Sequence, residues 1–259
     1  MSTILGPDGQ KLSKRHGATS VREFQVQGYL PEALGNYLAL LGWSPSEDGK
    51  EMMSLDEIAA EFNLTRIQKS PATFDNMKLD WMNRSYINQT ADDVLMNLSK
   101  AFFIDAGLIP PGPDARILDW LQRVIGLIKM RVDHLDQLPA EAAVIYGLDP
   151  EAPQLDDEAV EFLGMQEGKA VAAEFIRLVD AGPDLTPESY RGMVAEVKKT
   201  TGQKGRILFH SIRAALTGRG SGPELEKLIS LYEEGSKLTL PRKVMSCRER
   251  LHAIFDSLE

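Results

Sequence analysis

Residues 29–43 read YLPEALGNYLALLGW. Pro31 suits the first position of a helix because it has no backbone N–H to leave unpaired, and Gly42 suits the end. The apolar residues between these ends recur every three or four positions, which is the spacing of one helical face: Leu30, Ala33, Leu34, Tyr37, Leu38 and Leu41. The stretch therefore predicts a helix that buries one face.

Helix signals of the same kind recur along the whole chain. Ser54 and Glu57 form the pattern of a capping box, in which each side chain pairs with a backbone N–H at the start of a helix. Thr90 and Thr186 are placed to start two further helices, and Pro241 is placed to start a last one. Strand signals are nearly absent. We therefore expect an all-α protein built from consecutive small helical bundles.

Two proline-rich stretches predict where the chain divides. Residues 110–113 read PPGP, and these prolines fix φ and remove backbone donors. Residues 149–153, DPEAP, form a second break. We expect three parts: residues 1–90, a helical bundle over residues 91–148 and a second bundle over residues 149–259.

Composition restricts the class of protein. The chain has 259 residues, 43% of them hydrophobic and 26% charged, which is ordinary for a globular protein. A single cysteine, Cys247, excludes an internal disulfide and a Cys-rich zinc site. No apolar run approaches the roughly 20 residues of a membrane-spanning helix, and the amino terminus lacks the segments of a signal peptide. We expect a reduced, cytoplasmic protein with no membrane contact and no structural metal.

The charges are strongly segregated, although their sum is −9. Residues 132–168 contain ten acidic residues and no Lys or Arg, whereas residues 198–223 contain six basic residues and no Asp or Glu. Anion binding depends on the local potential and not on the total charge. Each run alone fits a solvated charged face, but two runs of opposite sign favour a selective anion-binding surface on the basic one.

The sharpest local motif is residues 6–17, GPDGQKLSKRHG. A glycine-rich turn is followed by three cations around one hydroxyl group: Lys11, Lys14 and Arg15 around Ser13. Such a loop can close over phosphates and stabilise charge that develops on them. It lacks the glycine–lysine spacing of a P-loop. Judged from these residues alone, a solvated basic loop is the alternative.

Residues 11–15, KLSKR, resemble the second signature of class I aminoacyl-tRNA synthetases, in the form found in bacterial-type glutamyl-tRNA synthetases. Residues 29–43 resemble the helix after that signature, and residues 74–87 resemble the end of the stem-contact region. Residues 213–218, RAALTG, resemble the carboxy-terminal anticodon-binding helix. These four blocks occur in the family's order and make the chain similar to the carboxy-terminal portion of that family.

The resemblance implies a ligase that activates glutamate with ATP and magnesium and esterifies it to the 3′ end of its tRNA. Residues 1–90 would hold the signature loop and the stem-contact helices, and the two bundles would bind the anticodon. By residue match, Lys11 and Lys14 would contact the ATP phosphates, and Ser13 would support the loop together with Arg15.

The family's other signature, a His-rich motif of the nucleotide-binding fold, is absent, as are the glutamate pocket and the acceptor-stem domain. Phosphate contacts without those pockets cannot position an attack. We therefore expect a piece of a longer enzyme whose Met1 was chosen or added for expression, with a natural short paralogue as the alternative. This piece alone should bind no ATP or magnesium and should be inactive. Its expected partner is the tRNA for glutamate, and its expected state is a monomer.

Anticodon reading requires stacking on bases and hydrogen bonds to their edges. Arg213 can do both and is the first candidate for an anticodon contact, with a surface helix arginine as the alternative. Leu225 matches a position where the family packs an apolar side chain on an anticodon base, and core packing is its alternative. Lys198 and Lys199 are candidates for contacts with tRNA phosphates.

Arg131 aligns with a position at which glutamate-specific members of the family carry an arginine that judges the third anticodon base. Members that also charge glutamine tRNA often lack it. The leading hypothesis is therefore recognition of glutamate tRNA. Its rivals are a ligase that also charges glutamine tRNA and a non-catalytic RNA- or protein-binding module. Trp81 and Tyr86 are either stacking platforms or core residues.

Overall fold

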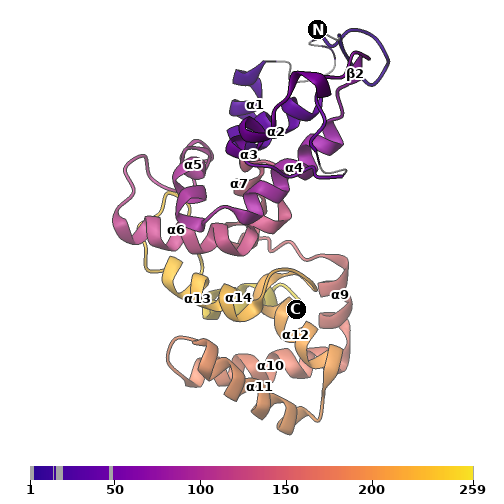
Figure 1. Ribbon diagram of the computed structural model, residues 1–259. Helices are drawn as coiled ribbons and strands as arrows, with labels where there is room; N and C mark the ends of the chain where they lie inside the picture. The colour runs from indigo at the N-terminus through magenta and orange to yellow at the C-terminus, as the bar shows by residue number, and fades with distance from the viewer. Residues whose placement is uncertain (1–2, 14, 16–19, 47–48, 259) are drawn as a thin grey trace. The chain divides into compact units, whose positions relative to one another are not determined.

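The computed structural model describes residues 3–13, 15, 20–46 and 49–258. Helices account for nearly all of the regular structure in these ranges, and strands are confined to one sheet of two short strands (Figure 1). The all-α class predicted from the helical spacing is confirmed. Of the helices in these ranges, none combines the length and the apolar character that a membrane crossing requires.

The chain folds into two compact units. Unit 1 comprises Met1–Phe102 and Lys129–Leu138, and unit 2 comprises Phe103–Ile128 and Pro139–Glu259. Unit 1 is therefore completed by a segment that returns to it after the first stretch of unit 2. The division into functional parts at residues 1–90, 91–148 and 149–259 stays a prediction.

Unit 1 consists of short helices and a small parallel sheet. In this sheet Ile4 pairs with Ala72, and Leu5 pairs with Thr73. Its elements, of which the last part of α5 belongs to unit 2, are β1 (Ile4–Leu5), α1 (Val21–Gln27), α2 (Pro31–Leu40), α3 (Leu55–Glu61), η2 (Leu64–Arg66), β2 (Ala72–Thr73), α4 (Asn76–Gln89), α5 (Asp92–Asp105), η3 (Lys129–Arg131) and η4 (Leu135–Gln137).

An aromatic cluster forms the core of unit 1. The rings of Phe24 and Tyr37 have their centroids 5.9 Å and 5.1 Å from that of Phe74. The N–H of Asp75 donates to the Tyr37 hydroxyl at 2.7 Å, and burial raises the pKa of Tyr37 to about 12. Leu12 packs against this cluster. The core therefore anchors the chain in the middle of the KLSKR motif.

Unit 2 is built from longer helices. α7 starts at Leu138, the last residue of unit 1. The helices that follow α5 are α6 (Ala115–Ile128), α7 (Leu138–Glu141), α8 (Ala143–Tyr146), α9 (Asp157–Gly164), α10 (Gln166–Ala181), α11 (Pro187–Thr201), α12 (Gly205–Thr217), α13 (Leu225–Gly235) and α14 (Cys247–Asp256). α10 packs against both α11 and α12, and α12 also packs against α9 and α14.

Local capping signals set the two ends of α11 as the sequence predicts. The side chain of Thr186 accepts a hydrogen bond from the N–H of Ser189, and Pro187 occupies the first turn. The helix ends at Gly202, whose φ of 71° lies in the left-handed region. Both boundaries of this helix therefore follow from residues within one turn of them.

The start of the last helix differs from the prediction. A start at Pro241 is wrong, because α14 begins at Cys247. Ser246 and Glu249 form a reciprocal capping box there, with the hydroxyl of Ser246 accepting from the N–H of Glu249. This capping box pairs two backbone N–H groups at the helix start, whereas a proline pairs none, so it is the stronger signal for where the helix begins. Pro241 lies in the segment that precedes α14.

Long-range hydrogen bonds satisfy two large polar side chains in the core of unit 2, those of Trp120 and Tyr232. The indole N–H of Trp120 donates to the carbonyl of Leu231 at 2.9 Å. The hydroxyl of Tyr232 donates to the carbonyl of Val144 at 2.9 Å. Both side chains are almost fully buried, and buried polar groups without a partner are strongly destabilising. These bonds therefore join α6 and α8 to α13.

Candidate functional site

The loop expected to hold phosphates begins as a tight turn. The N–H of Gly6 donates to the carbonyl of Gln10 at 2.7 Å, and that of Gly9 donates to the carbonyl of Gly6 at 3.0 Å. Gly9 has a φ of 71°, which glycine adopts without steric conflict. The turn brings Lys11 back beside Leu5, with which it forms an antiparallel bridge.

The described part of the KLSKR motif presents three side chains to solvent, those of Lys11, Ser13 and Arg15. Lys11 and Ser13 are exposed on either side of Leu12, which packs inward. Arg15 pairs with Asp8 at 3.1 Å within the same loop. Lys14 lies outside the described residues. Lys11 and Ser13 can therefore be reached by an anion, whereas the charge of Arg15 is partly balanced by its own loop.

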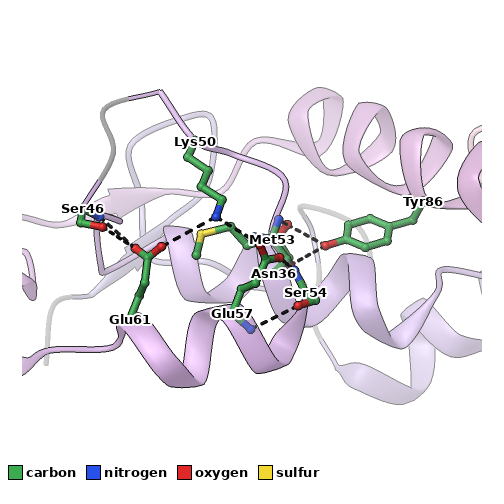
Figure 2. A network of polar contacts seen from close by, with 8 residues as sticks. All are labelled: Asn36, Ser46, Lys50, Met53, Ser54, Glu57, Glu61 and Tyr86. Carbon is green, nitrogen blue, oxygen red and sulfur yellow. Dashed lines mark hydrogen bonds and ion pairs between the residues drawn. The ribbon is translucent and has the colours of Figure 1, made fainter.

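A polar network ties the segment after α2 to its neighbours in unit 1 (Figure 2). The hydroxyl of Tyr86 lies 2.6 Å from the carbonyl oxygen of Met53, to which it can donate, and 2.9 Å from Oδ1 of Asn36. Asn36 is fully buried, and its Oδ1 accepts from the N–H of Met53 at 2.9 Å. The hydroxyl of Tyr86 is therefore used inside the protein, which fits a core residue. Trp81 is 44% exposed, so its ring is partly accessible.

α3 carries three acidic residues, Asp56, Glu57 and Glu61, and Lys50 pairs with the last two. Figure 2 shows Lys50 between Glu57 and Glu61, whose carboxylates lie 3.2 Å and 3.7 Å from its ammonium group. Ser46 donates from its hydroxyl to Glu61 at 2.8 Å. These bonds lower the pKa of both carboxyl groups, mainly through backbone hydrogen bonds from Ser54 to Glu57 and from Ser46 to Glu61. This side of unit 1 is therefore a poor candidate for binding an anion.

Arg131 lies on the surface of unit 1, at the end of the short helix η3. Its neighbour Val132 is 1% exposed and anchors the turn in the core. Lys129 donates to the carbonyl of Thr90 at 2.9 Å and pairs with Asp92 at 2.8 Å. The turn is therefore fixed from both sides, so the side chain of Arg131 projects from a backbone held by its neighbours.

Arg213 lies on α12 in unit 2, half-buried beside the loop that leads to α13. Its Nη1 donates to the carbonyl of Pro223 at 2.9 Å. Burial lowers the pKa of this guanidinium, although Tyr190 and Tyr232 act in the opposite direction. A guanidinium carries five N–H donors, and within the described residues Pro223 is its one hydrogen-bond acceptor. Arg213 therefore keeps donors for a ligand.

The glycine-rich loop after α12 is held by two anchors. The N–H of Gly220 donates to the carboxylate of Asp156 at 3.0 Å, and the hydroxyl of Thr217 accepts from the N–H of Arg219 at 3.1 Å. A Cβ on Gly220 would lie 2.3 Å from the side chain of Glu158, so the close approach requires glycine. The loop that carries the acceptor of Arg213 is therefore fixed in place.

The other predicted tRNA contacts also lie in unit 2. Leu225 starts α13 and is 7% exposed, so most of its side chain packs inside the unit. Lys198 and Lys199 are exposed in the last turn of α11. Lys199 lies 3.6 Å from Glu196. The structure thus places Lys198, Lys199, Arg213 and Leu225 in one unit, whereas Lys11, Ser13 and Arg131 lie in the other.

The acidic and basic runs of the sequence meet within unit 2. Glu158 of the acidic run lies 3.2 Å from Arg206 and 3.1 Å from Nδ1 of His210. The guanidinium of Arg206 also lies over the ring of Phe162, 5.5 Å from its centroid. Part of the basic run is therefore balanced by the acidic run, and Lys199 at the end of α11 is partly balanced by Glu196.

Sequence reasoning did not single out Arg250, which is 1% exposed. Its Nε donates to the carbonyl of Leu216 at 2.7 Å, and its Nη1 and Nη2 donate to those of Ile145 and Val144, each at 3.2 Å. Its guanidinium lies 4.1 Å from the centroid of the Tyr232 ring. Its position among apolar residues at helical spacing could have indicated that it is buried. A buried charge requires hydrogen-bond partners, and these three carbonyl groups supply them.

The described residues contain no group of three or more His, Cys, Asp or Glu side chains that could hold a metal ion. Unit 2 carries a different set of groups. This set consists of exposed ammonium groups, a half-buried guanidinium and a rigid loop.

Two family models match the chain. Residues 1–81 match the catalytic domain of the class I tRNA synthetases for E and Q, and residues 94–236 match an anticodon-binding domain. The second match covers more than half of the chain. It includes Arg131, Lys198, Lys199, Arg213 and Leu225, and the first includes Lys11, Ser13 and Lys14.

Curated relatives agree with these matches. A glutamate–tRNA ligase of Natranaerobius thermophilus is 40% identical over 232 residues, which are 89% of this chain and 47% of the relative. A glutamate–tRNA ligase of Heliobacterium modesticaldum is 40% identical over 238 residues, which are 91% of this chain and 47% of the relative. The chain therefore spans about half the length of the curated relatives that it matches.

The fold is also similar to that of solved structures. The crystal structure of a glutamate tRNA ligase from Elizabethkingia meningosepticum, in complex with its amino acid, superposes with a TM-score of 0.77 at 23% identity. The match covers 100% of this chain and 51% of that one. At this identity the likeness concerns the fold.

Proposed function

The chain belongs to the class I tRNA synthetases of the glutamate and glutamine type, and on that premise we propose that it is the tRNA-reading part of a glutamate–tRNA ligase. The observation that carries the proposal is the setting of Arg213 inside the region that matches the anticodon-binding model. Its guanidinium is half-buried, is oriented by Pro223 and has donors left over. Such a group suits the edge or the face of an unpaired base.

The lysines at the end of α11 take the second role in this proposal. Lys198 and Lys199 are exposed and lie in a stretch without Asp or Glu, so they suit the phosphates of the tRNA backbone. Phosphate contacts position an RNA without reading its sequence. Leu225 takes a supporting role, because its 7% exposure leaves only a small surface for a base while its packing positions the start of α13.

The parent ligase would use ATP and magnesium to activate glutamate. In it, Lys11 and Lys14 would contact the ATP phosphates, and Ser13 would support the loop. The exposure of Lys11 and Ser13 beside a turn closed by two backbone hydrogen bonds supports this assignment. We propose that such a ligase works as a monomer in the cytoplasm on the tRNA for glutamate.

The test of the proposed function is the binding of this chain to labelled glutamate tRNA, measured by fluorescence anisotropy at physiological salt. Replacing the anticodon should weaken binding by about 1–3 kcal/mol for each base that is read. The matched control is the same tRNA with substitutions in its D loop. Equal affinity for all of these tRNAs would show binding to phosphates alone and would overturn the assignment of anticodon reading.

A separate test concerns the signature loop. The chain alone should give no ATP–pyrophosphate exchange with glutamate and tRNA, because phosphate contacts without an adenosine pocket cannot position the attack. In a full-length relative, alanine at the position of Lys11 should lower the exchange rate without changing tRNA affinity. Exchange by the chain alone, at a rate above buffer, would refute the first expectation.

A ligase that also charges glutamine tRNA is the second candidate, and Arg131 decides between them. The two anticodons differ at the third base, C against G. A guanidinium has only donors, so it suits the O2 and N3 acceptors of cytosine and meets N1–H and N2–H of guanine unfavourably. An uncompensated donor costs on the order of 1–3 kcal/mol. The exposure of Arg131 on a fixed turn supports its access to a base.

Arg131→Gln supplies both a donor and an acceptor, so it should narrow the preference between the two tRNAs, mainly by improving glutamine tRNA. The change is grafted into a full-length relative, and the charging of both tRNAs is compared. Arg66→Gln, at an exposed arginine of the same unit, is the control for lost charge. An unchanged ratio for Arg131→Gln would make this arginine a surface charge.

A further inference from the structure

Phe209, a large aromatic residue, lies on α12 one helical turn before Arg213. Phe209 is 52% exposed, although α12 buries most of its other apolar residues. It precedes Arg213 by four residues, and side chains at this spacing lie next to each other on one face of a helix. A single exposed apolar residue is ordinary on a protein surface. The meaning of Phe209 therefore depends on its surroundings.

The stretch of sequence that contains Phe209 is basic, although Arg206 within it pairs with Glu158. Phe209 lies within the stretch from Lys198 to Pro223, which contains six cations and no Asp or Glu in a chain of net charge −9. On one side Arg213 is fixed by its bond to Pro223 at 2.9 Å. The backbone of the helix is continuous from Gly205 to Thr217, so the ring and the guanidinium are carried by one rigid element.

A nucleotide matches this combination of charges and surfaces. It brings an anionic phosphate, which suits the lysines, and the π-face of a base, which suits an exposed ring. An apolar peptide or another helix face would cover Phe209 but would gain nothing from the surplus of positive charge. An acidic peptide would suit the charge but would offer no large flat surface to the ring. The charge complementarity therefore selects RNA as the occupant.

We propose that Phe209 is a stacking platform for one unpaired base of the tRNA, next to the base that Arg213 contacts. This inference rests on the proposed function and adds to it a residue that neither the motif nor the family match singled out. The base stacks on the Phe209 ring, and Arg213 supplies hydrogen-bond donors one helical turn further along α12. The ring makes no hydrogen bond, so it adds affinity without choosing strongly among bases.

The experiment compares Phe209→Ala, Phe209→Leu and Phe209→Trp in the whole chain, by anisotropy of labelled glutamate tRNA over a range of salt concentrations. Loss of one stack lowers affinity by roughly 5- to 100-fold. We expect this loss for both the alanine and the leucine variant, whereas the tryptophan variant keeps the affinity of the original chain. The slope of affinity against salt should be the same in all four proteins, because stacking releases no counterions.

The matched control is Val160→Ala on α9, since Val160 is 54% exposed and lies in the same unit. Its affinity for tRNA should be unchanged. Thermal melts of all variants check that the fold is kept, as expected for side chains that are half in solvent. If Phe209→Leu binds as tightly as the original chain, the contact is merely apolar and the stacking assignment is overturned.

A second measurement identifies the base. 2-Aminopurine is placed at each anticodon-loop position in turn, because its fluorescence is quenched when it stacks. One position should be quenched on binding to the original chain and to Phe209→Trp, and should stay bright with Phe209→Leu. If no position responds in this way, the inference is overturned.

The two proposals fail in different ways. A chain that binds every tRNA equally, or none, overturns the proposed function together with this inference. A chain that distinguishes anticodons but tolerates Phe209→Ala without loss overturns this inference alone.

Discussion

The guanidinium groups of Arg250 and Arg213 both lie beside α12, but in contrasting environments. Arg250 is 1% exposed and donates to three carbonyl groups, those of Leu216, Ile145 and Val144. Arg213 is half-buried and donates to one, that of Pro223. A guanidinium whose donors are used inside the protein holds the fold together. Arg250 belongs to α14 and contacts the end of α12, whereas Arg213 belongs to α12 and has donors left for a ligand.

The environment of Arg250 explains why it is tolerated in a core. It reaches the last turn of α12 and the short helix α8, where carbonyl groups lack partners within the helix. These ends carry partial negative charge, which favours a cation. The face of the Tyr232 ring, 4.1 Å away, adds a cation–π contact. Arg250 therefore stabilises the last turn of α12, the helix that also carries Arg213 and Phe209.

The largest effect that follows from this contrast is on stability. Arg250→Met should lower the free energy of unfolding by roughly 2–5 kcal/mol, because the carbonyls of Leu216 and Ile145 lose their donor while buried. Urea denaturation followed by tryptophan fluorescence measures this loss. Arg242→Met is the matched control, since Arg242 is exposed in the same unit. Equal midpoints for the two variants would remove the structural role assigned to Arg250.

The next effect is on binding. Arg213→Ala should weaken the affinity for glutamate tRNA by about 1–3 kcal/mol. The loss of its single bond to Pro223 should lower stability by only about 1 kcal/mol. The loss of affinity should disappear when the anticodon is replaced. Arg219→Ala removes an exposed charge from the same stretch and should act on all tRNAs alike. If Arg213→Ala lowers the affinity equally for tRNAs with the original and with the replaced anticodon, base recognition by Arg213 is contradicted.

A smaller effect is expected for the lysines of α11. The double change Lys198→Ala and Lys199→Ala should weaken all tRNAs alike, because phosphates carry no sequence information. The slope of log affinity against log salt should become shallower by about 1–2. Lys243→Ala, at an exposed lysine paired with Glu249, should leave the slope unchanged. An unchanged slope in the double variant would place the RNA backbone elsewhere.

The smallest effect is on the rate at which Cys247 is labelled. This rate reports on the buried core that also contains Arg250. Cys247 is fully buried, and burial raises the pKa of its thiol well above the ordinary range. A raised pKa leaves less reactive thiolate at pH 8 than an exposed cysteine would have. Iodoacetamide should therefore label Cys247 slowly in the folded chain and rapidly in urea, as followed by mass spectrometry. Rapid labelling of the folded chain would show that this core opens.

Local sequence patterns predicted those features that depend on neighbouring residues. The spacing of apolar residues in the stretch from Tyr29 to Trp43 predicted α2, and the capping box at Ser54 predicted the start of α3. The start of α14 was misplaced because Pro241 is a weaker signal than the capping box at Ser246. All three outcomes were determined by hydrogen bonds or packing within about one helical turn.

The candidate site was predicted in part. Sequence reasoning singled out Arg213 and the lysines of α11, and the structure adds that Pro223 orients the guanidinium while Glu196 lies beside Lys199. It could not give the exposure of Phe209, because an apolar residue on an amphipathic helix is expected to face the core. Only the packing of α12 against its neighbours leaves this side chain in solvent.

The sequence by itself determined the helical class, the starts of α2, α3 and α11 and the family to which the chain belongs, because each of these depends on residues close together in the chain. Only the tertiary structure decided which cationic side chains are bonded inside the protein and which are available to a ligand. Arg250 bonds to groups 34, 105 and 106 residues away. Glu158 meets Arg206 across 48 residues. Such partners are chosen by how the helices pack, and no local pattern records that choice.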